Sequence, residues 1–370
     1  MRELLEKIFQ RIKRTNAYEP CRDLYDMSRE ALISEKKLGV EYLVRLAEYL
    51  SWSMINVAWS REDVKKIFDL HSWVLLAAAP YNFDCYIQYI EWNREPEKAF
   101  YHPRRKRLKQ VADALQALAD DEIDLLAISM PPGSGKTTIA IFFLTWLAGK
   151  YPEDPMLTGS HSNSFVRGVY DECLRIFDPR GDYLWHYVFP GVNVTNTNAK
   201  DCRIDLGKRK RFETLEFTSI GTGNAGLYRA ARLLYCDDLV SGIEVALSKE
   251  RLDKLWETYT TDLRQRKIGN KCKELHIATR WSVHDIIGRL EREYSDNPRA
   301  RFIVIPALDE DDESNFDYMY GVGFSTKFYH EQREIMDPAN WKALYMNEPI
   351  EREGQLYNAD ELRRYFELPN

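Results

Sequence analysis

Residues 130–138 read Met-Pro-Pro-Gly-Ser-Gly-Lys-Thr-Thr, and this stretch decides the fold that we predict. The apolar run 125–130 before it predicts a strand, and the residues after it predict a helix over Lys136–Ala148 that stops at Gly149. A glycine-rich turn between a strand and a helix is typical of a phosphate-binding loop. Its backbone N–H groups can turn towards phosphate oxygens, and the helix N-terminus attracts negative charge. The standard form begins with Gly where this chain has Met130.

The loop residues have expected roles in binding ATP and Mg²⁺. We expect Lys136 to reach the β- and γ-phosphates and the Thr137 hydroxyl to ligate Mg²⁺. The residues expected to contact the nucleotide phosphates are Pro132, Gly133, Ser134, Gly135, Lys136, Thr137 and Thr138.

From about residue 100 onwards, short β-type runs alternate with helical ones, which predicts an α/β fold with a mainly parallel sheet flanked by helices. Residues 1–97 instead predict a helical N-terminal subdomain, in which Ser60 caps a helix over Arg61–Leu70. We assign residues 98–348 to a P-loop domain and residues 349–370 to a linker and tail. The predicted strands are 125–130, 156–159, 214–219, 233–236, 274–278 and 301–305, and a further helix is predicted over 162–176.

The composition of the chain is that of a soluble globular protein. Its 370 residues are 44% apolar and 30% charged, and the net charge of −6 leaves the partner open, because a local basic strip suffices to bind nucleic acid. No apolar stretch approaches the ~20 residues of a membrane span, and the N-terminus lacks a signal-peptide core. The six cysteines form no CxxC pair, which argues against a zinc ribbon and favours reduced thiols in an intracellular protein.

A second motif, Leu233-Leu-Tyr-Cys-Asp-Asp238, is an apolar strand that ends in two acids. Carboxylates at the carboxyl edge of an open α/β sheet lie where ligands bind. We expect Asp237 to hold Mg²⁺ and Asp238 to orient or deprotonate the attacking water. Motor ATPases usually carry Glu at the second position, so Glu244 is an alternative catalytic acid. A strand followed by an ordinary acidic turn is the other interpretation.

The third motif, Leu275-His-Ile-Ala-Thr-Arg-Trp281, predicts a strand that ends near the phosphate loop. Thr279 at such a strand end can sense the γ-phosphate. The alternative is a capped strand end with an exposed Arg280.

In their order along the chain, these motifs resemble the ATPase part of the large subunit of tailed-phage terminases, the DNA-packaging motors. The resemblance covers roughly residues 100–355 and does not extend to residues 1–95. The matching segments are PPGSGKTT (131–138), KYPEDP (150–155), GSHS (159–162), GLYRAARLLYCDD (226–238), SGIE (241–244) and ATRWSVHDIIGRL (278–290).

The resemblance implies an ASCE-type, RecA-like P-loop ATPase that pumps double-stranded DNA. It would do so as a homo-oligomeric ring docked on the portal protein of an empty procapsid in the host cell cytoplasm, together with a small terminase subunit. The family tends to carry an arginine finger in the loop, where this chain has Gly133. Arg229, donated from a neighbouring subunit, is our first choice instead and Arg264 the second, with a surface arginine as the alternative for each. Tyr101 stands where the family often places base-contacting groups, but a hydrophobic lead-in to the next helix explains it as well.

Several features of the sequence allow more than one interpretation. The basic runs 104–107 and 208–211 can track a phosphate backbone or can simply be solvated. The family normally carries a second, RNase H-like nuclease domain, which we do not find in this sequence, so we expect no nuclease activity from these residues. Three different functions also fit a P-loop chain: a helicase-like nucleic-acid ATPase, a small-molecule P-loop kinase and a non-catalytic P-loop scaffold.

Overall fold

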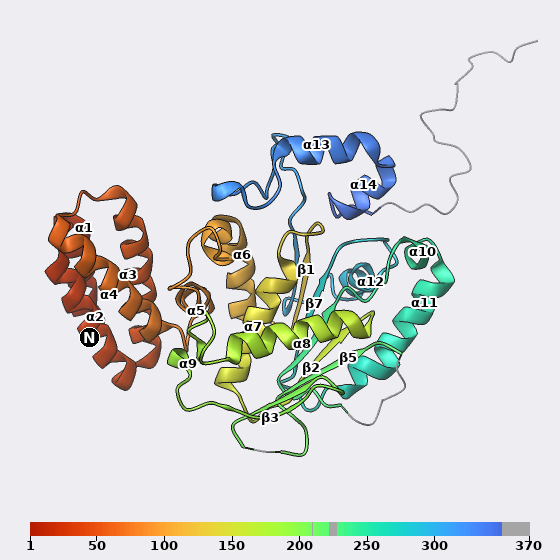
Figure 1. Ribbon diagram of the computed structural model, residues 1–370, viewed down its shortest axis with the longest axis horizontal. Helices are drawn as coiled ribbons and strands as arrows, with labels where there is room; N and C mark the ends of the chain where they lie inside the picture. Colours follow the sequence, from red (N-terminus) through yellow and green to blue (C-terminus); the bar gives the residue numbers. More distant parts are fainter. Residues whose placement is uncertain (209, 222–227, 350–370) are drawn as a thin grey trace, which may run out of the picture.

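The computed structural model describes residues 1–208, 210–221 and 228–349. Within them the chain forms a mixed α/β structure around an eight-stranded sheet, ordered β3-β4-β5-β2-β6-β7-β1-β8, with helices on both sides (Figure 1). Three parts of the sequence analysis concern positions outside the described residues: residues 350–370 of the predicted linker and tail, Gly226 and Leu227 of the segment GLYRAARLLYCDD, and Arg209 of the second basic run. The strands are β1 (Leu125–Ser129), β2 (Met156–Ser160), β3 (Val194–Asn198), β4 (Arg203–Leu206), β5 (Leu215–Ser219), β6 (Leu233–Asp237), β7 (Lys273–Ala278) and β8 (Ala300–Val304).

The six predicted strands are confirmed, and they form the parallel part of the sheet, β5-β2-β6-β7-β1-β8. Strands β3 and β4 were not predicted, and they pair antiparallel at the β5 edge. In the order of the sheet, β7 lies between β1 and β6. The two acids that end β6 are therefore separated from the loop after β1 by one strand.

Helices cover both faces of the sheet, which explains why its central strands are continuously apolar. On β1, Leu126 and Ile128 belong to one apolar cluster and Leu125 to another. The face with Leu126 and Ile128 is covered by α6 (Tyr101–Ala119), α7 (Lys136–Lys150) and α8 (Asn163–Phe177). The face with Leu125 is covered by α11 (Lys249–Thr258), the π-helical turn η1 (Tyr259–Leu263) and α12 (Ile286–Glu293).

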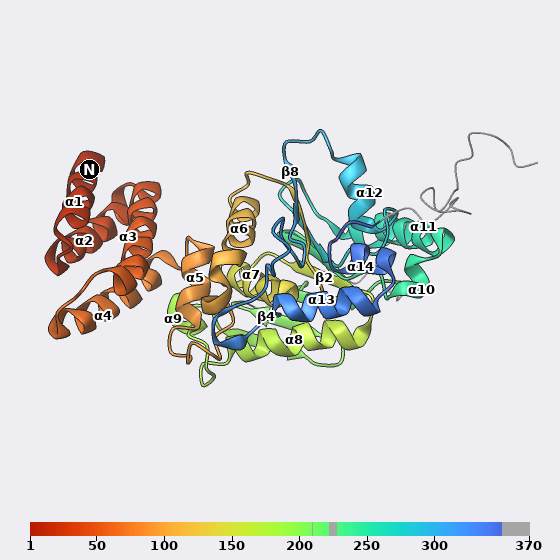
Figure 2. The ribbon, with the colours of Figure 1, turned by 90° about the horizontal axis from the view of Figure 1, so that it is seen from above.

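The N-terminal residues are helical, as predicted. Four helices, α1 (Arg2–Thr15), α2 (Tyr18–Ser34), α3 (Lys36–Asn56) and α4 (Arg61–Ala78), form a bundle at one end of the molecule (Figures 1 and 2). Ser60 caps α4 as predicted, since its hydroxyl accepts a hydrogen bond from Asp63 N. The following α5 (Phe83–Ile90) packs on both α6 and α7, and so joins the bundle to the body of the sheet. The domain boundary near residue 97 stays a prediction.

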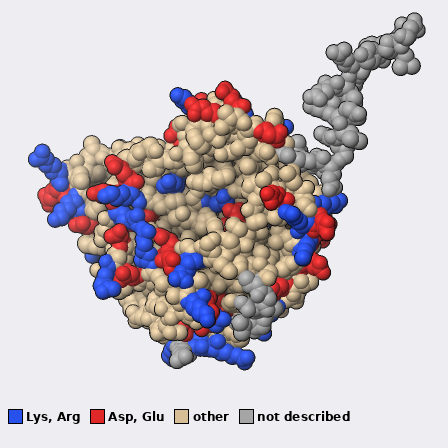
Figure 3. Space-filling model, turned by 45° about the vertical axis from the view of Figure 1, so that its right-hand side comes forward, with Lys and Arg blue, Asp and Glu red and all other residues tan. Residues whose placement is uncertain are grey.

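The remaining elements connect or cover this framework. Chain segments after β8 run over the carboxyl edge of the sheet and include α13 and α14 (Figure 1). The face in Figure 3 carries acidic and basic side chains interspersed rather than separated into regions of one sign. The other helical elements are α9 (Trp185–Val188), α10 (Ile243–Ala246), η2 (Arg264–Arg266), η3 (Met319–Gly321), α13 (Thr326–Ile335) and α14 (Pro338–Leu344).

Two predicted helix ends are wrong. The helix predicted over Arg61–Leu70 continues to Ala78 as α4. Helix α7 does not stop at Gly149 but continues to Lys150. A Cβ on Gly149 would lie 2.3 Å from the Phe189 ring. This glycine therefore allows an aromatic side chain to pack against the helix backbone, and it does not end the helix.

Two further predictions can be compared with the structure. All six cysteines are free and buried, as predicted for reduced thiols. No helix in the described ranges is long and apolar enough to cross a membrane.

Candidate functional site

The candidate site lies at the carboxyl edge of the parallel strands. Strands β1, β2, β6 and β7 all end at this edge, so the loops that follow them converge. The loop 130–138 leaves β1 here and leads directly into α7.

Two glycines give the loop its shape. Gly133 and Gly135 have φ values of 73° and 92°, in the left-handed region that side chains disfavour. A Cβ on Gly133 would also lie 2.7 Å from the Phe324 ring, and one on Gly135 would lie 2.5 Å from the Phe100 ring. Inside the turn, the Ser134 hydroxyl donates to Pro131 O at 2.7 Å.

The first turn of α7 offers N–H groups to a ligand. Such groups have no partner within a helix, and Gly135 at the N-cap supplies no side-chain cap. Pro132 and Gly133 at the tip of the loop are exposed, and Thr137 and Thr138 are half-buried in the first turn. The loop and helix start thus have the polarity that anionic oxygens require.

Lys136 connects the loop to the two neighbouring strand ends. Its side chain is buried, and Nζ donates to Thr279 Oγ1 at 2.9 Å at the end of β7. The same Nζ lies 3.8 Å from Asp238 Oδ2 just after β6. The structure thus brings together three residues that the sequence motifs assign to one site.

Asp238 is held by both neighbouring strand ends. Its φ of 41° is unusual for a residue with a side chain, and such conformations are typical of sites where the surroundings impose them. Asp238 N donates to Ile277 O at 2.9 Å, and Oδ1 accepts from Thr279 N at 3.0 Å, both on the β7 side. On the β2 side, Asp238 O lies 2.7 Å from His161 Nδ1.

Asp237 is fully buried at the end of β6. Its Oδ2 accepts from the Tyr235 hydroxyl, while Oδ1 is buried without a hydrogen-bond partner among the described residues. Burial raises the pKa of Asp237 above its usual range, as does the nearby charge of Asp238. Tyr235, Lys136 and the Thr137 hydroxyl act in the opposite direction. A cation beside Oδ1 would remove this cost.

The residues around Asp237 fit a magnesium ion. Mg²⁺ typically keeps several waters and takes only one or two protein oxygens, so the Asp237 carboxylate and the Thr137 hydroxyl are a sufficient protein contribution. Over the described ranges, the structure contains no group of three or more His, Cys, Asp or Glu side chains that could hold a metal ion.

His161 was not predicted as a site residue. It follows β2, and its ring lies against the backbone of Asp238. In the sequence, His161 stands out only as part of the segment 159–162. The strand order, which places β2 beside β6, is the signal that identifies it.

The structure does not bring Glu244 or Arg229 into this network. Glu244 is exposed in the first turn of α10, and among the described residues it makes no hydrogen bond or ion pair to the loop 130–138. Arg229 N donates to Glu216 Oε2 at 3.0 Å, near the amino end of β5 and so away from the edge where Asp237 lies. Arg264 Nε donates to the buried Glu274 at 3.3 Å. An arginine finger from the same subunit is therefore not supported for Arg229.

Tyr101 is fully buried, and this corrects the expectation that it stacks on a base. Its hydroxyl donates to Asp84 Oδ1 at 2.7 Å, and its backbone N donates to Glu91. A hydrophobic lead-in to α6 agrees with this burial. Phe100, one residue earlier, is an aromatic side chain that does lie against the loop, at Gly135.

Arg280 and two cations of the basic runs have partners within the fold. Arg280 is not an exposed arginine, since only 6% of it is accessible and its Nε donates to Asp285 at 3.2 Å. In the two basic runs, Arg105 pairs with Asp84 at 2.7 Å and Lys210 with Asp205 at 2.8 Å. These two cations are therefore paired within the fold.

Comparisons with known proteins find a structural similarity but no match at the level of sequence. No protein-family model matches the chain, and no curated protein matches it. Among solved structures, the chain is similar to the large terminase of bacteriophage HK97, with 13% sequence identity and a TM-score of 0.43. The match covers 64% of this chain and 49% of that one, so it spans about half the length of the HK97 structure. At this level the similarity identifies neither a family nor an activity.

Proposed function

We propose that this chain is the ATP-hydrolysing motor domain of a viral terminase large subunit. In this proposal it is an ASCE-type P-loop ATPase that translocates double-stranded DNA into a procapsid. One observation carries the ATPase part. Lys136, Thr279 and Asp238 come from three separate segments and are connected by contacts of 2.9, 3.0 and 3.8 Å at the carboxyl edge of the sheet.

The arrangement assigns a role to each group in ATP hydrolysis. The first-turn amides of α7 and the Lys136 ammonium would bind the β- and γ-phosphates, and Asp238 would accept a proton from the attacking water. Thr279, bonded to both Lys136 and Asp238, would report whether the γ-phosphate is present. A Mg²⁺ ion held by Thr137 and Asp237 would offset the charge of the phosphate oxygens.

The DNA-packaging part of the proposal rests on the ordered set of motifs. Under it, the partners are double-stranded DNA, the portal protein of the procapsid and a small terminase subunit, and the chain acts as a homo-oligomeric ring in the host cell cytoplasm. Arg229 would then act on the site of a neighbouring subunit, since its own contacts lie near the amino end of β5.

The test is steady-state ATP hydrolysis by the purified chain in three conditions: alone, with double-stranded DNA, and with empty procapsids. We expect Mg²⁺-dependent hydrolysis that procapsids enhance and that Lys136→Ala abolishes. Hydrolysis at background in all three conditions would support a non-catalytic scaffold and overturn the proposal.

Two further results identify the competing enzymes. Stimulation by single-stranded nucleic acid but not by procapsids would favour a helicase-like ATPase. Transfer of the γ-phosphate to a small molecule in place of water would favour a kinase.

A further inference from the structure

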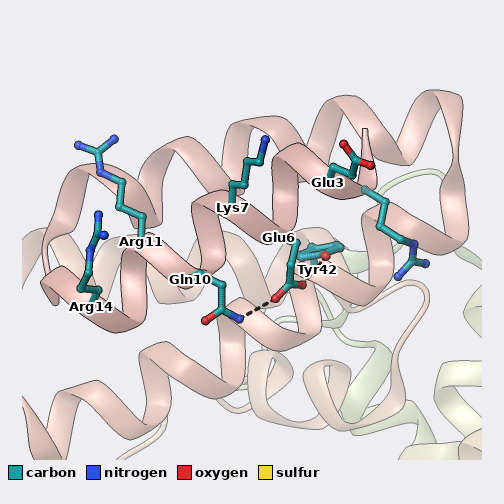
Figure 4. Close-up of a pocket in the computed structure, with 8 residues that line it drawn as sticks. Glu3, Glu6, Lys7, Gln10, Arg11, Arg14 and Tyr42 are labelled. Carbon is teal, nitrogen blue, oxygen red and sulfur yellow. Dashed lines mark hydrogen bonds between the residues drawn. The ribbon is translucent and has the colours of Figure 1, made fainter.

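Three cations on the first helix have no partner among the described residues. Lys7, Arg11 and Arg14 follow one another at spacings of four and three residues, which places them on one face of α1. All three are exposed, and their side chains make no ion pair or hydrogen bond within residues 1–208, 210–221 and 228–349. Figure 4 shows them projecting from α1 to the same side.

Of the two acidic side chains beside this row, Glu6 is paired within the bundle. Glu6 accepts from Arg45 at 2.7 Å, and also from Tyr42 and Gln10, so its charge is already paired. Arg45 and Tyr42 thus keep Glu6 turned away from the row. Glu3 is the remaining acid of the groove described next, and it lies in the first turn of α1, where the helix dipole favours it.

The three cations line an open groove of about 770 Å³ along α1. Apart from Tyr42, which is 1% accessible, every side chain that lines the groove is charged or an amide. Protein–protein interfaces have an apolar core, whereas nucleic-acid interfaces are polar and strongly positive. The groove carries four cations, Arg2, Lys7, Arg11 and Arg14, against two acids, so the charge that it presents is mainly positive, as a surface for phosphates requires.

A membrane surface is not a suitable partner for α1. An amphipathic helix binds lipid through its apolar face. On α1 that face is Leu5, Phe9 and Ile12, and it is buried in the bundle.

We propose that the Lys7–Arg11–Arg14 row binds the phosphate backbone of double-stranded DNA without regard to sequence. From Lys7 to Arg14 the helix rises about 10 Å, which is about the length of three base-pair steps of 3.4 Å along the axis of a duplex. The choice of DNA over another duplex nucleic acid rests on the proposed function. The phosphate contacts themselves rest on the three exposed cations and on the excess of cations over acids in the groove. This gives the N-terminal bundle, which no motif covers, a role in holding DNA.

The test compares two triple variants of the full chain with the same change in charge. The first is Lys7→Gln/Arg11→Gln/Arg14→Gln. The control is Lys37→Gln/Arg61→Gln/Lys65→Gln, which removes three exposed cations from elsewhere in the bundle. Binding to a duplex of about 30 base pairs is measured by fluorescence anisotropy, without nucleotide, at several salt concentrations.

We expect the first variant to bind at least about tenfold more weakly at low salt than the wild type. We also expect its plot of log affinity against log salt to be flatter by about 3, because each lost phosphate contact lowers the slope by about 0.9. The control variant should differ from the wild type much less. Circular dichroism checks that both variants are folded.

Equal affinity and equal slope for the two variants would overturn the inference. Failure of the wild-type chain to bind the duplex would overturn it too. So would the finding that an acidic polypeptide binds to the row whereas DNA does not. ATP hydrolysis without DNA should be unchanged in the first variant. This separates failure of the DNA surface from failure of the proposed ATPase, which Lys136→Ala tests.

Discussion

One buried histidine, which stays neutral in the folded chain, should make the protein less stable in mild acid, where the unfolded chain binds a proton at this residue. His71, in α4, is 3% accessible, and neither ring nitrogen has a hydrogen-bond partner among the described residues. Its ring packs edge-on against Trp92, with centroids 5.1 Å apart. Burial, with a further contribution from the charge of Arg105, lowers the pKa of His71 from 6.5 to about 3.

The direction and size of the effect follow from linkage between protonation and folding. A histidine whose pKa is lower in the folded chain contributes its full stability above pH 6.5, and this contribution is lost as the pH falls towards 3. At about pH 5, which is about 1.5 units below the unfolded-state pKa of 6.5, His71 is protonated in the unfolded chain but not in the folded chain. This difference stabilises the unfolded chain by about 2 kcal/mol.

The experiment compares the wild type with His71→Phe, which keeps a ring against Trp92 but cannot titrate. Urea denaturation followed by tryptophan fluorescence gives the free energy of unfolding of each protein between about pH 8 and pH 5. We expect the difference between the two to change by about 2 kcal/mol in favour of the variant as the pH falls. Replacing the exposed His102 with Gln serves as the control. Parallel pH curves for wild type and His71→Phe would refute the reasoning.

Three further predictions concern the proposed ATPase site. Asp238→Asn should reduce hydrolysis more than Glu244→Gln, because Asp238 contacts Thr279 and lies near Lys136, whereas Glu244 is exposed on α10. Steady-state assays that show the reverse order would make Glu244 the catalytic acid. Thr279→Val should lower kcat roughly 10- to 100-fold with little change in KM, since it removes a hydrogen bond to a charged group worth about 1.5–3 kcal/mol; an unchanged kcat would show that the Lys136–Thr279 bond is not needed. Mixing Arg229→Ala with Lys136→Ala protein should restore part of the hydrolysis if the arginine acts between subunits, and activity that stays at background would count against such a finger.

Most of the parallel sheet could be predicted from the sequence because its strands are buried on both faces. Runs such as 125–130 and 233–236 are apolar at nearly every position and end at turn residues or acids, so their limits were visible. Strand β3 has the sequence Val-Thr-Asn-Thr-Asn and is mostly exposed. A short polar edge strand of this kind has no apolar pattern to predict it.

The candidate site was predictable to the extent that strand ends define it. The residues after β1, β6 and β7 meet because parallel strands end at one edge. His161 could not be chosen in the same way, since only the strand order shows that β2 lies beside β6. Tyr101 has a suitable position before the loop, but its side chain is held inside by Asp84. The direction of a side chain at the start of a helix depends on packing that the local sequence does not reveal.

The bonds of Asp238 have a consequence for how a water molecule can be held. Its N–H, its carbonyl and Oδ1 are all used on Ile277, His161 and Thr279, so Oδ2 is the oxygen that faces Lys136. A carboxylate with one oxygen to offer can fix the distance of a nucleophile but not its direction. In the proposed hydrolysis of ATP, the angle at which water approaches the phosphorus would then be set by a second group. Because the N–H, the carbonyl and Oδ1 of Asp238 already contact neighbouring strand ends, the proposed ATPase would need a second residue, other than Asp238, to set this angle.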